Sequence, residues 1–224
     1  MTFGEILTTL FIGPLQLLFE TVFTVANRMV RNPGLSIVAL SLAMNFLVLP
    51  LYKRADAMQE EERQTELKLR KGVAHIKKVF RGDERMMMLQ TYYRQNHYKP
   101  SYVLKGAASL LLEIPFFIAA YRFLSGLKLL NGVSFGPIGD LGRPDGMMVL
   151  GSLTVNLLPI LMTAINLVSC VIYTKGSLPK TKIQLYAMAI FFLFFLYGSP
   201  SGLVFYWTLN NLFSLCKTLC YKSK

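Results

Sequence analysis

Long uncharged apolar runs alternate with shorter polar stretches along this chain. An α-helix needs about 20 consecutive apolar residues to cross a bilayer, and only helices and closed barrels satisfy their backbone hydrogen bonds there. The last apolar run is too long for one span and contains the turn sequence Gly198-Ser199-Pro200-Ser201-Gly202, which divides it in two. The pattern therefore predicts an all-α polytopic membrane protein with five transmembrane helices, at residues 32–52, 102–125, 147–174, 182–198 and 200–217.

The N-terminal segment, residues 1–31, has a different pattern. After Gly13-Pro14, polar residues recur every three to four positions, and leucine, valine and phenylalanine fill the opposite side. This spacing predicts an amphipathic helix that lies in the membrane interface, with Pro14 in its first turn. A secretory signal peptide is the weaker interpretation, because the start MTFGEI has an acid and no base and because no small-residue cleavage site follows.

Residues 53–99 form the only long polar segment. Apolar residues at helical spacing from Met58 to Phe80, the turn sequence Arg81-Gly82-Asp83 and a second periodic stretch predict a helical hairpin outside the bilayer. Methionines in it suit weak contact with varied apolar segments, since methionine adapts its shape; packing within the hairpin is an equal alternative. These contact candidates are Met58, Met86, Met87 and Met88. We expect residues 126–146 to form an extracytoplasmic loop and residues 218–224 a short basic tail.

The distribution of charge predicts the orientation. The chain has 224 residues, is 53% hydrophobic and only 16% charged, and carries a net charge of +12, which argues against a water-soluble enzyme and a disordered basic nucleic-acid binder. Eighteen of the 24 Lys and Arg residues lie in the hairpin, the loop after the third span and the tail, against five on the other side. Because cytoplasmic loops carry the excess of Lys and Arg, we expect a multi-pass membrane protein whose hairpin lies in the cytoplasm, or in the matrix or stroma of an organelle. Its N-terminus is expected outside and its hairpin and C-terminus inside, with no sequence-specific nucleic-acid binding.

Polar side chains inside the predicted spans are expensive in lipid and usually face protein or water. They define a predicted groove: Ser41, Asn45, Ser109, Glu113, Thr163, Asn166, Trp207, Asn210, Asn211 and Ser214. One interpretation is hydrogen bonding between helices, and the other is a water-filled cavity that opens to the cytoplasm. Glu113 favours the cavity: Arg122 falls on the opposite helix face, so Glu113 must reach water, pair with a substrate or be protonated.

No catalytic or ligand-binding set is visible in the sequence. It has no Ser-His-Asp arrangement, no His/carboxylate metal spacing and no phosphate-binding glycine loop. The three cysteines, Cys170, Cys216 and Cys220, have no metal-type spacing and imply no disulfide framework. The sequence therefore predicts no enzyme, no metal site and no cofactor.

The last predicted span carries a specific sequence signature. Residues 200–214, Pro-Ser-Gly-Leu-Val-Phe-Tyr-Trp-Thr-Leu-Asn-Asn-Leu-Phe-Ser, resemble the last span of the YidC/Oxa/Alb family of membrane protein insertases. Other stretches resemble that family in the same order: Asn32–Ile37, Leu49–Leu51, Glu113–Phe117 and Leu158–Met162. The resemblance covers nearly the whole chain, from the amphipathic helix to the fifth span.

The resemblance implies five helices around a hydrophilic groove that opens to the cytoplasm and to lipid and is closed on the outside. It implies an insertase or membrane chaperone of the bacterial cytoplasmic membrane, whose cytoplasmic hairpin meets incoming chains. The implied partners are nascent membrane proteins and the lipid bilayer, with the ribosome and a Sec-type translocon as further candidates. Trp207 matches the family's aromatic groove position.

One position departs from the family pattern. The family typically places an arginine five residues before the proline that ends the first core span, and counting back from Pro50 gives Asn45. Glu113 stands where the family often has glutamine. The cation that attracts acidic substrate segments is therefore missing at this position. This makes a specialised insertase-like scaffold, dedicated to one membrane complex, the second interpretation. A small transporter or channel that uses Glu113 is the third, and five spans without an inverted repeat argue against it.

Overall fold

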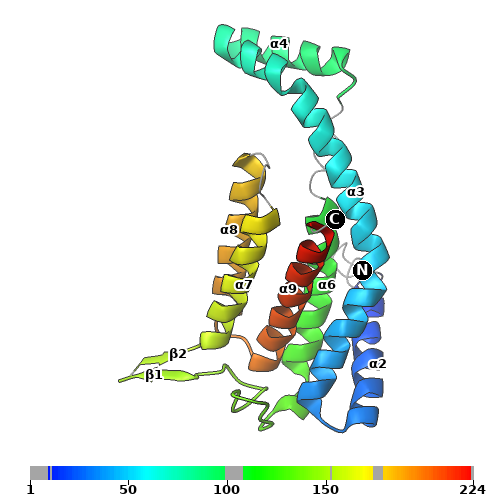
Figure 1. The fold of residues 1–224 in the computed structure, drawn as a ribbon, viewed down its shortest axis with the longest axis vertical. Coiled ribbons are helices and arrows are strands. Elements are labelled where there is room, and N and C mark those ends of the chain that lie inside the picture. Colours follow the sequence, from blue (N-terminus) through cyan, green and yellow to red (C-terminus); the bar gives the residue numbers. More distant parts are fainter. Residues whose placement is uncertain (1–9, 11, 99–107, 152, 174–178, 223–224) are drawn as a thin grey trace. The chain divides into compact units, whose positions relative to one another are not determined.

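The computed structural model describes residues 10, 12–98, 108–151, 153–173 and 179–222, and most of them are helical (Figure 1). The helices are α2 (Gly13–Val30), α3 (Pro33–Val79), α4 (Gly82–Gln95), α6 (Ala108–Gly126), α7 (Leu157–Tyr173), α8 (Pro179–Leu196) and α9 (Ser201–Lys222). A short 3-10 turn, Lys128–Leu130, and the strands β1 (Met148–Leu150) and β2 (Leu153–Val155) lie between α6 and α7. The chain divides into two compact units. We call residues up to Leu47 and from Phe117 onward the bundle unit, and Val48–Phe116 the hairpin unit.

The amphipathic helix α2 packs its apolar face on other helices of the bundle unit. Its two buried residues are Phe19 and Phe23, and their rings meet Tyr206 of α9 and Phe123 of α6 edge to face, each at 5.7 Å between ring centroids. The helix ends at Arg31, which adopts a left-handed conformation with φ 52°. The helix itself agrees with the sequence pattern, and its position in the membrane interface stays a prediction.

Helix α3 runs for 47 residues without the predicted change of element at Lys53. The sequence pattern separates an apolar span from a polar hairpin there, but the backbone continues through Pro50 and beyond it. The residues that follow Tyr52 are mostly Lys, Arg, Ala, Met, Gln and Glu, all good helix formers, so the helix has no local reason to stop. Among the described helices, α3 is the one both long and apolar enough to cross a membrane; Leu157–Ile172 and Leu185–Leu196 are shorter apolar stretches.

In the hairpin unit, α4 is held to α3 by aromatic contacts. A Cβ placed on Gly72 would overlap the Tyr92 ring, so glycine allows the two helices to approach closely. The Tyr98 hydroxyl donates a hydrogen bond to the buried Glu62 carboxylate at 3.1 Å. Burial, together with this bond, raises the pKa of Tyr98 above its ordinary value. The turn between the helices falls at the predicted Arg81-Gly82, where Gly82 has φ 56°.

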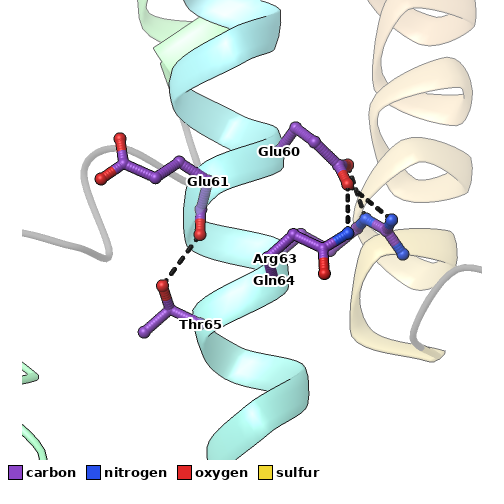
Figure 2. A network of polar contacts seen from close by, with 5 residues as sticks. All are labelled: Glu60, Glu61, Arg63, Gln64 and Thr65. Carbon is purple, nitrogen blue, oxygen red and sulfur yellow. Dashed lines mark hydrogen bonds and ion pairs between the residues drawn. The ribbon is translucent and has the colours of Figure 1, made fainter.

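The surface of α3 in the hairpin unit carries a polar network around Glu60 (Figure 2). The Arg63 guanidinium donates to Glu60 through Nε and Nη2, both at 2.7 Å, and Gln64 donates through Nε2 at 2.7 Å. Chiefly because of the hydrogen bond from Arg63, the pKa of Glu60 lies below its ordinary value. These i,i+3 and i,i+4 contacts support the solvated face of the helix.

The predicted third span is wrong at its N-terminal side. Residues 147–174 were expected to form one helix, but Met148–Val155 form an antiparallel β-hairpin and α7 begins only at Leu157. Gly146 and Gly151 have φ 48° and 64°, which permits the turns. The Asp145 carboxylate accepts hydrogen bonds from the backbone N–H groups of Leu157, at 2.7 Å, and of the next residue, and so fixes where the helix begins. Periodicity cannot separate a short apolar strand from a helix within one uncharged run.

The loop after α6 packs tightly against the starts of α3 and α9. Leu130 and Leu141 are fully buried in it. The backbone N–H of Gly202 donates to the Leu141 carbonyl at 2.8 Å. A Cβ at Gly202 would lie 2.9 Å from the Leu130 side chain and 3.0 Å from that carbonyl, and a Cβ at Gly34 would overlap the Phe135 ring. The predicted loop is thus an ordered layer over this end of the bundle unit.

Candidate functional site: a polar cluster between apolar helices

Three neutral polar side chains meet between α3 and α9 in the bundle unit. The Asn210 side-chain oxygen accepts hydrogen bonds from the Ser41 hydroxyl and from the Asn45 amide, each at 2.7 Å. The Asn45 amide also donates to the backbone carbonyl of Ser41 at 2.8 Å, which fixes its rotamer. We call Ser41, Asn45 and Asn210 the polar cluster.

The sequence positions the polar cluster through helix geometry. Ser41 and Asn45 are four residues apart and share one face of α3, and the neighbouring Leu40 and Met44 are buried in the core. Ser41 is 2% exposed, whereas Asn45 and Asn210 are only half-buried. The Ser41 hydroxyl is therefore buried, whereas the side-chain amides of Asn45 and Asn210 remain partly exposed at the surface of the bundle unit. Hydrogen-bonding capacity is thus available partway along otherwise apolar helices.

The polar residues predicted on α7 form their bonds within that helix. The Thr163 hydroxyl is buried and donates to the Pro159 carbonyl at 2.8 Å. The Asn166 side-chain oxygen accepts a bond from the Cys170 thiol at 3.4 Å. Helix α7 packs beside α8 and α9, but no bond among the described residues joins Thr163 or Asn166 to the polar cluster. The structure therefore brings together part of the predicted groove set.

Trp207 lies one turn before Asn210 on α9, inside an aromatic group. Its ring centroid is 5.2 Å from that of Phe117, 5.9 Å from Phe192 and 5.7 Å from Tyr206. The indole is 8% exposed, and its Nε1 has no hydrogen-bond partner among the described residues. A buried donor without an acceptor is costly, so the indole N–H is available to an incoming acceptor.

The aromatic group extends further than the sequence pattern indicated. Phe117 of α6 contacts both Phe192 and Phe195 of α8, at 4.9 and 5.5 Å between ring centroids. Phe192 is partly covered by these contacts, while Phe194 on the same helix is 82% exposed. Two other predicted groove residues lie on later turns of α9, where Asn211 is half-buried and Ser214 is exposed.

Glu113, Ser109 and the four methionines belong to the hairpin unit. Glu113 is half-buried on α6, two residues before Pro115, and no hydrogen bond or ion pair joins it to another described residue. The Ser109 side chain lies outside the described ones. Met58, Met86, Met87 and Met88 are 43%, 57%, 66% and 38% exposed. The methionines therefore do not form the core of the hairpin unit, and the alternative that they serve its packing loses its support.

Sequence reasoning missed Tyr206 and misplaced Asn156. Tyr206 is 4% exposed and meets both Phe19 and Trp207 edge to face within the aromatic group. Its only signal in the sequence was its place next to Trp207. Asn156 falls inside the predicted third span, residues 147–174, but it lies before α7 and its amide donates to the Tyr197 carbonyl at 2.7 Å. Asn156 therefore joins the base of the β-hairpin to the end of α8 by hydrogen bonds.

The helices and the neutral cluster between them define a class, that of helical proteins with a polar site among apolar helix faces. Residues 25–224 match the model of the 60Kd inner membrane protein family, and the chain therefore belongs to this family. It is a membrane protein by this membership.

Curated relatives agree with the family. The chain is 27% identical over 224 residues to the membrane protein insertase YidC of Treponema denticola, covering 93% of this chain and 37% of that protein. It is 32% identical over 200 residues to the membrane protein insertase YidC of Pasteurella multocida, covering 87% of this chain and 34% of that protein. The chain thus spans about a third of the length of the curated relatives it matches.

A solved structure shares the fold. The active YidC insertase crystal structure with the first transmembrane domain resolved matches with a TM-score of 0.58 and 22% sequence identity, over 95% of this chain and 46% of that chain. The helical fold expected from the sequence is therefore confirmed at the level of architecture. Its number of membrane crossings is a separate matter.

Proposed function

We propose that this chain is a membrane protein insertase or chaperone that moves hydrophobic segments of nascent proteins into the bilayer through a polar groove. The observation that carries the proposal is the polar cluster of Ser41, Asn45 and Asn210, which lies between helices that are otherwise apolar. Relatives over most of the chain are named insertases, which supports the same function.

The proposed topology has five crossings in the bacterial cytoplasmic membrane. They are the first part of α3, together with α6, α7, α8 and α9. Helix α7 has 17 residues and extends about 26 Å at 1.5 Å per residue, somewhat less than the hydrocarbon thickness of about 30 Å. The Lys and Arg bias supports an outer N-terminus and an inner C-terminus and hairpin. Helix α2 would lie in the outer interface.

The proposed mechanism needs no nucleotide and no covalent step. Each unsatisfied backbone polar group costs several kcal/mol in hydrocarbon. The amides of Asn45 and Asn210 can exchange their mutual bonds for bonds to a substrate's polar flank, so the flank crosses a thinner apolar barrier. The substrate's apolar segment then partitions to lipid, which contributes roughly 25 cal/mol per Å² removed from water. The chain therefore acts as a chaperone for partitioning and not as an enzyme.

The hairpin unit supplies the proposed first contact. Its exposed methionines, Met86 and Met87 above all, present flexible apolar side chains that accept segments of different shapes. Nascent membrane proteins and lipid are the proposed partners. The basic hairpin surface also suits contact with a ribosome, and a Sec-type translocon is a further candidate. Glu113 is proposed to face the groove or a substrate from α6.

The substrate class follows from the neutrality of the polar cluster. Without a cation at Asn45, the site offers hydrogen bonds but no Coulomb attraction for an acidic flank. We therefore expect substrates whose translocated flanks are short and uncharged. The same neutrality, with the Ser41 and Asn45 donors already satisfied by Asn210, is the observation that favours the second candidate function, a scaffold dedicated to one complex.

Complementation tests the proposal. An insertase-depleted bacterium would receive the unaltered chain, the Asn45→Arg variant or the Asn210→Ala variant, with Thr21→Ala as a matched control. The Thr21 hydroxyl donates to the Leu17 carbonyl within α2 and lies outside the polar cluster. We expect the unaltered chain and Thr21→Ala to restore growth and Asn210→Ala to fail. Rescue by Asn45→Arg alone would support the dedicated scaffold, and rescue by none of the folded variants would refute insertase activity.

A further inference from the structure

The β-hairpin formed by β1 and β2 carries no charged residue, and Met148 and Val149 on its first strand are exposed apolar side chains. Its register pairs Met148 with Val155, Val149 with Thr154 and Leu150 with Leu153. Successive residues of a strand point to opposite faces, and the successive residues Met148 and Val149 are 47% and 66% exposed. From Gly146 to the end of α7 the chain has no charged residue. The hairpin therefore presents apolar side chains in two opposite directions.

This composition does not suit water. A single two-stranded hairpin is marginally stable there. Between Gly146 and Asn156 neither charge nor proline is present. A protein partner docked on the face of Met148 would leave Val149, which is 66% exposed, uncovered.

The composition does not suit the hydrocarbon core either. Each strand of a two-stranded hairpin leaves one edge of backbone N–H and C=O groups without a partner in the sheet, and lipid tails cannot satisfy them. The boundary between headgroups and acyl chains meets both requirements. It offers apolar volume to Met148 and Val149, and water and headgroup oxygens to the open edges.

The base of the hairpin is fixed to the bundle unit. The Gly146 N–H donates to the Asn156 side-chain oxygen at 3.0 Å, and the Asn156 amide donates to the Tyr197 carbonyl at the end of α8 at 2.7 Å. In Figure 1 the hairpin leaves the beginning of α7 and extends to the side of α7 and α8 instead of continuing along their axes. Its direction is therefore set by hydrogen bonds.

The exposed apolar surface of α7 continues into the hairpin. Leu157, Ile160 and Leu161 in the first turns of α7 are 43%, 42% and 51% exposed, and the hairpin follows directly on their N-terminal side. Tyr197, at the same end of the bundle unit, is 37% exposed, and tyrosine is enriched where a membrane meets water. The lipid-facing surface proposed for α7 and the hairpin thus form one continuous surface.

We propose that the β1–β2 hairpin is a membrane-surface anchor whose partner is the headgroup–acyl boundary of the lipid bilayer, on the side where α7 begins. The proposal rests on the proposed crossing of the membrane by α7. By lying flat in this layer, the hairpin holds the beginning of α7 and the end of α8 at a fixed depth.

Tryptophan fluorescence in vesicles tests the anchor. The chain has one tryptophan, Trp207, so the unaltered protein gives the background to subtract from Val149→Trp. The full chain would be reconstituted in phosphatidylethanolamine and phosphatidylglycerol vesicles with bromine either near the acyl carbonyl or at mid-chain. Val168→Trp, 50% exposed and eleven residues into α7, reports the hydrocarbon core, and His75→Trp, exposed in the hairpin unit, reports water. Thr154→Trp, across the hairpin from Val149, replaces Val149→Trp if that variant does not fold.

We expect the fluorescence added by Val149→Trp to be shifted to the blue and quenched most by bromine near the carbonyl. His75→Trp is expected to remain unquenched. If Val168→Trp is quenched while the hairpin probe is not, the anchor is wrong and the proposed crossing stands; a blue-shifted but unquenched hairpin probe would then indicate cover by protein, such as a second copy. If Val168→Trp is not quenched either, α7 does not cross the membrane, and the anchor fails with the proposed topology.

Discussion

The two hydrogen bonds accepted by Asn210 give a prediction that can be worked out in magnitude. In Asn210→Ala, the Ser41 hydroxyl and the Asn45 amide both lose an acceptor at 2.7 Å. Hydrogen bonds between helices in membrane proteins contribute about 0.6 kcal/mol on average and up to about 1.7 kcal/mol. We therefore expect Asn210→Ala to lower the free energy of unfolding by about 1–3 kcal/mol, the sum of two such bonds.

A double-mutant cycle isolates one of these bonds. Ser41→Ala removes one donor, and its effect combined with Asn210→Ala is expected to be smaller than the sum by about 0.6–1.7 kcal/mol. Thr208→Ala is the matched control: its hydroxyl is also buried, on α9, but donates to the Val204 carbonyl of the same helix. No coupling is expected between Ser41→Ala and Thr208→Ala.

The assay is denaturant unfolding of the full chain in detergent micelles, followed by helical circular dichroism for each variant. The reasoning would be refuted if Ser41→Ala and Asn210→Ala were additive to within about 0.3 kcal/mol, the usual tolerance for independent sites. Equal coupling in the Thr208 control would also refute it, because that result would reflect a general response of α9.

Three further predictions concern Gly202 and Asp145 in the bundle unit and Glu60 in the hairpin unit. Gly202→Ala is expected to lower the unfolding free energy by about 1–3 kcal/mol through overpacking against the Leu141 carbonyl, measured in the same unfolding assay. Asp145→Ala is expected to cost about 0.5–2 kcal/mol as a lost helix cap and to speed hydrogen exchange in the first turn of α7, but not of α9. The pKa of Glu60 is lowered in the folded chain, so the stabilisation from Arg63 is present above the ordinary carboxyl range and is lost as pH falls through the lowered pKa. The difference in unfolding free energy between Glu60→Gln and the unaltered chain should therefore become smaller as the pH falls. A difference that does not change with pH would contradict this prediction.

The sequence predicted the helices well, because their signal is strong and local. Uncharged runs and the turn at Gly198–Gly202 correspond to α8 and α9 within a few residues at each end. The β-hairpin was missed because hydropathy does not distinguish strand from helix within one apolar run. The signal that decided it, Asp145 capping α7 across the hairpin, depends on the folded chain.

The candidate site was predictable in part. Ser41 and Asn45 were recognisable as one face from their i,i+4 spacing, but only the packing of α3 against α9 identifies Asn210 as their common acceptor. Thr163 was grouped with them on polarity alone. Its hydroxyl bonds to its own helix, a choice open to any threonine in a helix. Polarity selected the candidate residues, and tertiary packing determined which of them meet.

An insertion assay with purified protein tests the central claim most directly. Vesicles that contain the full chain would be given a substrate with one apolar segment and a short uncharged flank, and protease protection of the flank would measure insertion. The account predicts that the variant with Ser41, Asn45 and Asn210 all replaced by alanine loses insertion, while the Thr208→Ala control inserts at the unaltered rate. If the folded triple variant inserts the substrate as fast as the unaltered chain, the polar cluster is not the insertion site.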